Sequence, residues 1–152
     1  MKTRILILAI FVTVLAQCLL SQTSAEQAYE SAYEKVLNED WKAASKDMAS
    51  VAEKYSQSEF VDDASFWQCY AQSQMSTSLE SAVACYENFI KTYPDSRWAN
   101  DAKMNLVTAA KRLASQGKRE YEAIIESYDE DADIDLKLTA LHALMNMDDE
   151  RA

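Results

Sequence analysis

The same helical pattern occurs twice between Trp41 and Ala102, at a constant offset of 38 residues. In this alignment Ala44 matches Ala82, and Tyr55 matches Tyr93. The other matched pairs are Met48 with Tyr86, Val51 with Phe89, Ser58 with Ser96, Phe60 with Trp98, Asp63 with Asp101 and Ala64 with Ala102. A fixed period between about 20 and 50 residues is typical of stacked repeats, because each unit buries an apolar face only against its neighbours. The sequence therefore predicts a stacked array of helical hairpins.

Helix breakers are rare, since the chain of 152 residues contains one Gly and one Pro. Apolar residues recur at helical spacing in segments separated by short polar turns. These segments cover residues 26–37, 41–54, 59–75, 79–92, 97–114 and 119–128, and a last one covers 136–147. Asp40 before the second segment and Gly117 after the fifth are typical helix-end residues. We therefore expect an all-α fold of about three helical hairpins plus one terminal helix.

Residues 1–25 have the three-part layout of a secretory signal peptide. Lys2 and Arg4 precede an uncharged run from Ile5 to Leu20, and a polar stretch ends at Ala25. We expect export, with cleavage after Ala25. A retained membrane anchor is one alternative, although an uncharged run of 16 residues is short for a span of about 20. A lipoprotein with its lipid on Cys18 is the other alternative.

The chain is strongly acidic, with a formal net charge of −10. Without the two basic residues of the signal, 13 basic and 25 acidic residues remain, a charge of −12. Nucleic acids and anionic lipid surfaces require a basic footprint, so this balance argues against both as partners. A basic protein partner is compatible with it.

The second copy of the pattern resembles the second helix of a tetratricopeptide repeat (TPR). The resemblance rests on Ala82, Tyr86 and Phe89, followed by Tyr93-Pro94-Asp95-Ser96. The segment from Trp67 to Ala71 similarly resembles the first-helix pattern of that family. The Tyr-Pro-x-Ser ending and the period near 38 are most similar to exported bacterial TPR proteins, such as the BamD-like outer-membrane assembly factors and the periplasmic Tol–Pal coordinator.

This resemblance implies a right-handed superhelix over residues 26–129, with a concave groove lined by the first helix of each hairpin. Residues 130–152 would add an acidic loop and a helix that caps the stack or, being similar to the first helix of a HEAT repeat, continues it. In the groove we expect Phe66, Trp67 and Tyr70 to contact a partner. The chain would then be a periplasmic, non-enzymatic protein-binding module or scaffold whose partners are envelope proteins. The alternative is a structural segment of a longer TPR–HEAT array.

Cys69 and Cys85 lie at the same level of their hairpin if the chain turns near Thr77. A disulfide between them is compatible with an oxidising compartment. Two buried thiols are the alternative, because free Cys is a good small core residue.

No constellation of catalytic, metal-binding or cofactor-binding residues is evident. The segment from Asp129 to Asp135 alternates like the start of a calcium loop, but Ile134 and Ala140 replace the Gly and the Glu that an EF-hand requires. His142 is the single histidine and has no Cys cluster for zinc. The adjacent acids Asp62–Asp63 are expected on a solvated helix face. We therefore expect no catalytic residue, no metal and no cofactor.

Overall fold

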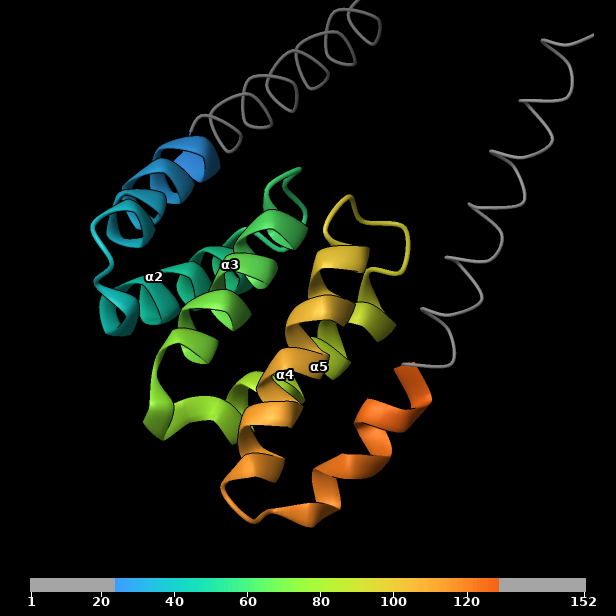
Figure 1. Cartoon of the computed structure of the whole chain (residues 1–152). Coiled ribbons are helices and arrows are strands. Elements are labelled where there is room, and N and C mark those ends of the chain that lie inside the picture. Colours follow the sequence, from blue (N-terminus) through green and yellow to red (C-terminus); the bar gives the residue numbers. More distant parts are fainter. Residues whose placement is uncertain (1–23, 129–152) are drawn as a thin grey trace, which may run out of the picture.

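The computed structural model describes residues 24–128, which are helical apart from short connections (Figure 1). Four helices are complete: α2 (Trp41–Lys54), α3 (Val61–Gln74), α4 (Leu79–Thr92) and α5 (Ala99–Ser115). Residues 24–37 and 122–128 are also helical, and two 3-10 turns, η1 (Ser76–Ser78) and η2 (Arg119–Tyr121), lie in the connections. The described part thus holds the first six of the seven helices that the sequence predicts. Residues 1–23 of the predicted signal peptide, the acidic segment 129–135, the predicted helix 136–147 and His142 lie outside it.

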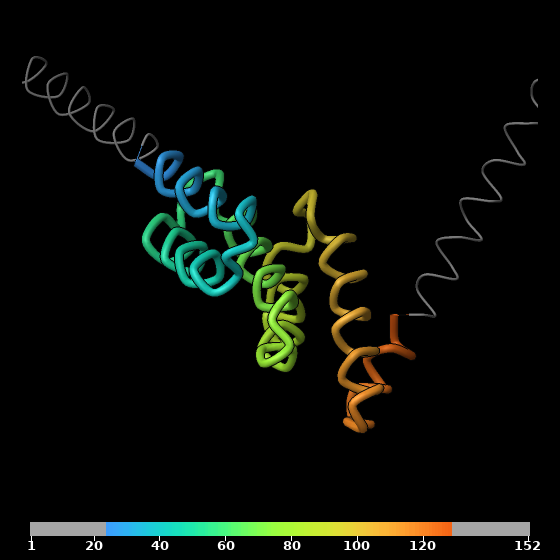
Figure 2. The backbone as a smooth tube through the Cα atoms, turned by 60° about the vertical axis from the view of Figure 1, so that its left-hand side comes forward, coloured from blue at the N-terminus to red at the C-terminus, as the bar shows by residue number. Residues whose placement is uncertain are grey.

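The helices pack against one another in the order of the sequence. α2 packs on α3, α3 on α4, α4 on α5, and η2 returns onto α5. Figure 2 shows the chain advancing from one end of the array to the other. This confirms the all-α array of helical hairpins. Within residues 24–128, no helix combines the length and the apolar character needed to cross a membrane.

Two apolar clusters form the core, and α3 contributes to both. The first cluster joins the helix 24–37 to α2 and α3, and its buried members are Ala32, Val36, Ala44, Met48, Val51, Ala64 and Ala71. The second joins α3 to α4 and α5 through Phe66, Cys69, Leu79, Ala82, Val83, Tyr86, Phe89, Ala102, Leu106, Ala109 and Leu113. Ala44 and Ala82, which the repeat aligns, are both fully buried, one in each cluster. Their small side chains thus lie where the helices of each cluster pack against one another.

The helix ends follow the cap residues that the sequence provides. The Asp40 carboxylate accepts a hydrogen bond from the N–H of Ala43 at 3.2 Å and so caps α2. Gly117 follows α5 with a φ of +92°, a conformation that glycine adopts without strain. The N–H groups of Gly117 and of the next residue donate to the carbonyls of Ala114 and Leu113, at 2.9 and 3.2 Å. This pair of bonds is the Schellman motif, which ends a helix.

Candidate functional site

Four half-buried aromatic rings from three helices contact one another in a row. This aromatic cluster consists of Tyr33 in the helix 24–37, Trp41 at the start of α2, and Trp67 and Tyr70 in α3. The Trp67 ring lies 5.1 Å from Tyr33 and 5.3 Å from Tyr70, and Tyr70 lies 5.9 Å from Trp41, all edge to face. Edge-to-face contacts are favourable for aromatic rings and hold each ring in place. The cluster is therefore an ordered apolar surface that is still partly open to solvent.

Phe66 does not belong to this surface. Its side chain is only 3% exposed, and its ring stacks on that of Trp98 with centroids 4.5 Å apart. It also contacts Phe89 in the second core cluster. The prediction that Phe66 contacts a partner together with Trp67 and Tyr70 is corrected by this burial. Neighbouring residues of a helix point about 100° apart. Phe66 therefore faces α4 and α5, whereas Trp67 lies between the two core clusters and contacts both Tyr33 and Trp98.

A buried carboxylate on α3 holds the connection between α4 and α5. Asp63, in the first turn of α3, is 9% exposed. Its oxygens accept hydrogen bonds from Arg97, at 3.1 Å from Nε and 2.6 Å from Nη2, and from the indole N–H of Trp98. Next to it, Asp62 accepts a hydrogen bond from the Ser96 hydroxyl at 2.7 Å. We call Asp63, Arg97 and Trp98 the clamp.

The clamp corrects the prediction that Asp62–Asp63 lie on a solvated face, because Asp63 is buried and fully paired. Charge-assisted hydrogen bonds offset the cost of removing a carboxylate from water. The hydrogen bond to Asp63 also raises the pKa of the Arg97 guanidinium further above its ordinary value. Sequence reasoning missed the clamp because its members are 34 and 35 residues apart. One signal was available, since the repeat places an aromatic residue at both Phe60 and Trp98, just before a first helix.

An open, mostly acidic cleft of about 490 Å³ borders the clamp, between the α2–α3 and α4–α5 connections. Figure 1 shows these two connections at the same end of the array. The lining residues are Glu59, Phe60, Asp62, Asp63, Asp95, Ser96 and Arg97. Within residues 24–128, no group of three or more His, Cys, Asp or Glu side chains is placed to hold a metal ion.

Tyr29 extends the aromatic contacts toward this cleft. Its ring stacks on Phe60 at 5.3 Å and on Tyr33 at 5.9 Å. Burial of the phenol, with a further contribution from the charge of Asp63, raises the pKa of Tyr29 to about 12. The hydroxyl therefore keeps its proton at neutral pH and can act as a hydrogen-bond donor.

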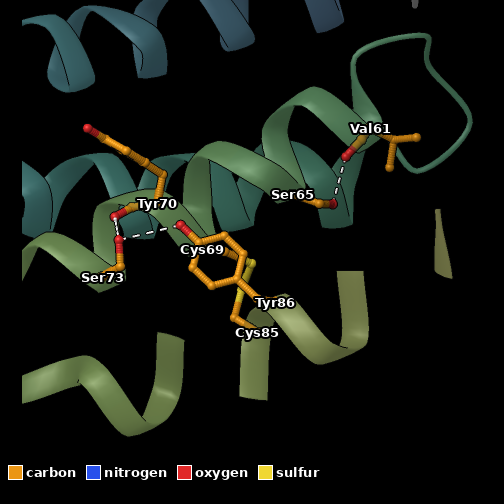
Figure 3. Close-up of a disulfide and its surroundings, with 7 residues drawn as sticks. All are labelled: Val61, Ser65, Cys69, Tyr70, Ser73, Cys85 and Tyr86. Carbon is orange, nitrogen blue, oxygen red and sulfur yellow. Dashed lines mark hydrogen bonds between the residues drawn. A yellow bond between two sulfur atoms is a disulfide. The ribbon is translucent and has the colours of Figure 1, made fainter. Parts of the chain in front are cut away.

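A disulfide joins Cys69 of α3 to Cys85 of α4, with Cα atoms 5.4 Å apart (Figure 3). Of the two alternatives for this pair, the structure thus has the crosslink. Beside it, the Tyr86 hydroxyl lies 3.4 Å from Ser73 Oγ, which donates to the carbonyl of Tyr70 at 2.7 Å. Burial raises the pKa of the Tyr86 phenol above its ordinary value. Disulfides persist in oxidising compartments, so the crosslink points to an extracytoplasmic location.

Neither protein-family models nor curated protein sequences match this chain. The roles of individual residues are therefore inferred from the geometry of the structure. The disulfide and the clamp join helices to one another. Trp67 and Tyr70 are the predicted site residues whose rings are still partly accessible.

Proposed function

We propose that this chain is a protein-binding module of the exported TPR type, acting as a non-enzymatic scaffold in the periplasm. The observation that carries the proposal is the aromatic cluster, whose rings brace one another, are partly exposed and lie on an array of helical hairpins. The disulfide supports the choice of an oxidising compartment, and the signal-like first 25 residues support export. Envelope proteins are the proposed partners.

An extended or helical partner segment would lie across Trp67 and Tyr70 and place apolar side chains against their exposed edges. Trp and Tyr are enriched among the residues that dominate binding energy. Because the rings already brace one another, binding costs them little conformational entropy. Gln68, which is partly exposed on α3, would supply polar contacts at the rim. The net negative charge of the chain favours a partner segment with basic residues around its apolar anchors.

Site-specific crosslinking in the envelope tests this proposal. A photo-reactive phenylalanine analogue replaces Tyr70, and in a matched control it replaces Tyr55, which is half-buried as well. Trp41 of the aromatic cluster is the first residue of α2, and Tyr55 directly follows its last residue. The control position therefore lies at the opposite end of this helix from the cluster. We expect the Tyr70 probe to capture one reproducible protein, and the Trp67→Ala variant to lose that product. Equal products from both positions, or a product that Trp67→Ala leaves unchanged, would contradict the proposal.

A further inference from the structure

The two halves of α3, residues 61–67 and 68–74, are held in place by different contacts. The clamp and the stacked ring of Phe66 join the first half to the connection between α4 and α5. The disulfide between Cys69 and Cys85 joins the second half to α4. The first half is therefore anchored by contacts that do not depend on redox chemistry, whereas the second half is anchored by a bond that does.

The disulfide is connected to Tyr70 of the aromatic cluster along two routes (Figure 3). One route is the backbone, because Tyr70 directly follows Cys69. The other route begins at Tyr86, which directly follows Cys85. Its hydroxyl lies 3.4 Å from Ser73 Oγ, and that Ser73 hydroxyl donates to the carbonyl of Tyr70 at 2.7 Å. A change at the sulfur atoms therefore reaches Tyr70 from both helices.

The two cysteines of the disulfide differ in exposure. Cys69 is 1% exposed and belongs to the second core cluster. Cys85 is only partly buried, and it lies in α4 beside the exposed Ala84 and one turn from the exposed Asn88. The rate of thiol–disulfide exchange depends on which sulfur atom a thiolate can reach. Because the core covers Cys69, the sulfur atom that a thiolate can reach is that of Cys85.

We propose that this disulfide is a redox switch that a dithiol reductant opens at Cys85. One thiolate of the dithiol attacks Cys85 Sγ, forms a mixed disulfide and releases Cys69 as a thiolate, which takes up a proton. The second thiolate attacks the reductant's own sulfur atom, closes the reductant's disulfide and releases Cys85, which is protonated in turn. Two electrons and two protons have then passed to the chain. A partner in the disulfide form reverses the steps.

Reduction leaves the fold in place and moves Tyr70. Free cysteine is a good small core residue, so the core tolerates the Cys69 thiol, and Arg112 still donates to the carbonyl of Ser73 at 2.7 Å. Two thiols nevertheless need more room than a disulfide, since atoms that are not bonded must stay at van der Waals distance. In a closely packed core such crowding shifts the neighbouring backbone. The shift falls on the second half of α3, because the clamp holds the first half.

A displaced Tyr70 would weaken partner binding at the aromatic cluster. The Tyr70 ring contacts Trp67 at 5.3 Å and Trp41 at 5.9 Å, so it is the link between these two rings. The oxidised chain is then the form that binds a partner, and the reduced chain is the form that releases it. This step rests on the proposed function, whereas the exchange at Cys85 and the response of α3 do not.

Mapping a mixed disulfide tests the point of attack. The mature protein is treated briefly with glutathione, a monothiol that stops at the first step, and free thiols are then alkylated. Mass spectrometry should find glutathione on Cys85 at least about ten times as often as on Cys69, whereas in urea the preference should fall below about twofold. The proposal is overturned by a preference for Cys69, by equal labelling of the folded protein, or by no labelling at a concentration that reduces the unfolded chain.

Hydrogen exchange before and after reduction with dithiothreitol tests the response of α3. Amides of residues 70–74 should exchange about tenfold faster in the reduced chain, whereas those of residues 64–67 should stay within about twofold. The control is the double variant Cys69→Ala/Cys85→Ala, on which the reductant should have no effect. An equal response in both halves of α3, or no response in either, contradicts the proposed switch.

Crosslinking from the probe at Tyr70 separates this inference from the proposed function. The yield of the captured protein should fall about tenfold in the reduced chain, as expected when a residue central to binding is displaced. An unchanged yield would show that the disulfide does not control binding. A probe that captures nothing in either redox state contradicts the proposed function alone, because the glutathione and hydrogen-exchange measurements need no partner.

Discussion

The two junctions between successive hairpins are aligned by the repeat and yet differ in chemistry. At the first junction Phe60 stacks on Tyr29, and within residues 24–128 no ion pair accompanies this contact. At the second, Trp98 stacks on Phe66 while Asp63 binds its indole N–H and the neighbouring guanidinium. An aromatic contact is thus common to both junctions, and the polar clamp is added at one. Aromatic stacking thus joins neighbouring hairpins at both junctions. At the second junction, the clamp also fixes the orientation of the two hairpins relative to each other.

The largest expected effect is a difference in stability between loss of Trp98 at the second junction and loss of Phe60 at the first. Trp98→Ala should lower the free energy of unfolding by about 3–5 kcal/mol, since it removes a large ring and leaves Asp63 with one donor fewer. Phe60→Ala should cost less, about 1–2 kcal/mol, because its half-buried ring has no polar partner. Urea unfolding of the mature protein measures both. An equal loss in the two variants would show that the clamp adds nothing to the second junction.

The crosslink is a second difference between the hairpins. Cys69 and Cys85 are 16 residues apart, and closing a loop of that size stabilises a fold by about 3 kcal/mol. In the first hairpin the equivalent positions are Ser31 and Asp47, which cannot be joined. Replacing both cysteines by Ala should therefore speed hydrogen exchange mainly in α3 and α4. If the helix 24–37 and α2 lost as much protection, the two hairpins would unfold as one unit.

Substitutions at Ala44 and Ala82 test a feature that the first two hairpins share, a buried alanine where helices pack. Both are fully buried at aligned positions, so Leu at either should destabilise through overpacking by about 1–3 kcal/mol. Ala84→Leu, at an exposed position of α4, is the control and should change stability by less than about 0.5 kcal/mol. Thermal or urea unfolding gives the three values. An unchanged midpoint for Ala44→Leu would mean that the first hairpin is packed more loosely than the second.

The first junction should also carry a pH dependence. In the folded chain, burial raises the pKa of Tyr29 from its ordinary value of 10.0 to about 12. The unfolded chain therefore loses this proton first, so the contribution to stability is complete below about pH 10 and is lost as the pH rises toward 12. Tyr29→Phe should flatten the decline of stability in this window, measured against wild type in the same buffers. A parallel decline in both proteins would show that the phenol is not protected by the junction.

The smallest effect concerns two helix ends with the same motif. Glu39 has a φ of +56°, and its N–H and that of Asp40 donate to the carbonyls of Val36 and Lys35 at 3.0 and 2.9 Å. This repeats the Schellman geometry seen at Gly117 with a residue less suited to it. Glu39→Gly should stabilise by about 0.5–1 kcal/mol, whereas Gly117→Ala should destabilise by a similar amount. The unfolding midpoints of the two variants, compared with that of the wild type, show whether each substitution raises or lowers stability. A loss of stability in Glu39→Gly would contradict the Schellman geometry at this helix end.

Local features were predictable because they depend on neighbours in the sequence. The cap at Asp40 and the helix end at Gly117 involve partners within a few residues. The bounds of α2 and α4 match the prediction, whereas α3 begins at Val61 instead of residue 59. There the turn continues, since the N–H of Val61 bonds to the carbonyl of Ser58. Helix ends of this kind are sensitive to one or two residues of turn geometry.

The candidate site was harder to predict, because it depends on the rotation of α3 about its axis. The spacing of Phe66, Trp67 and Tyr70 placed three aromatic residues on one helix, but α3 is packed on several sides and Phe66 turned out to be core. The same uncertainty in side-chain direction left Cys69 and Cys85 undecided between a disulfide and two thiols. A residue on a central helix has no solvent-facing stripe that would reveal its direction.

By itself, the sequence determined the all-α fold class of this protein and the order of the six helices within residues 24–128. These follow from periodicity, which each helix carries independently of the others. Only the tertiary structure decided which partners meet across the junctions, namely Asp63 with Arg97 and Trp98, and that Phe66 lies in the core. The physical reason is that such contacts join residues more than 30 positions apart, whose meeting depends on how successive hairpins are rotated against each other.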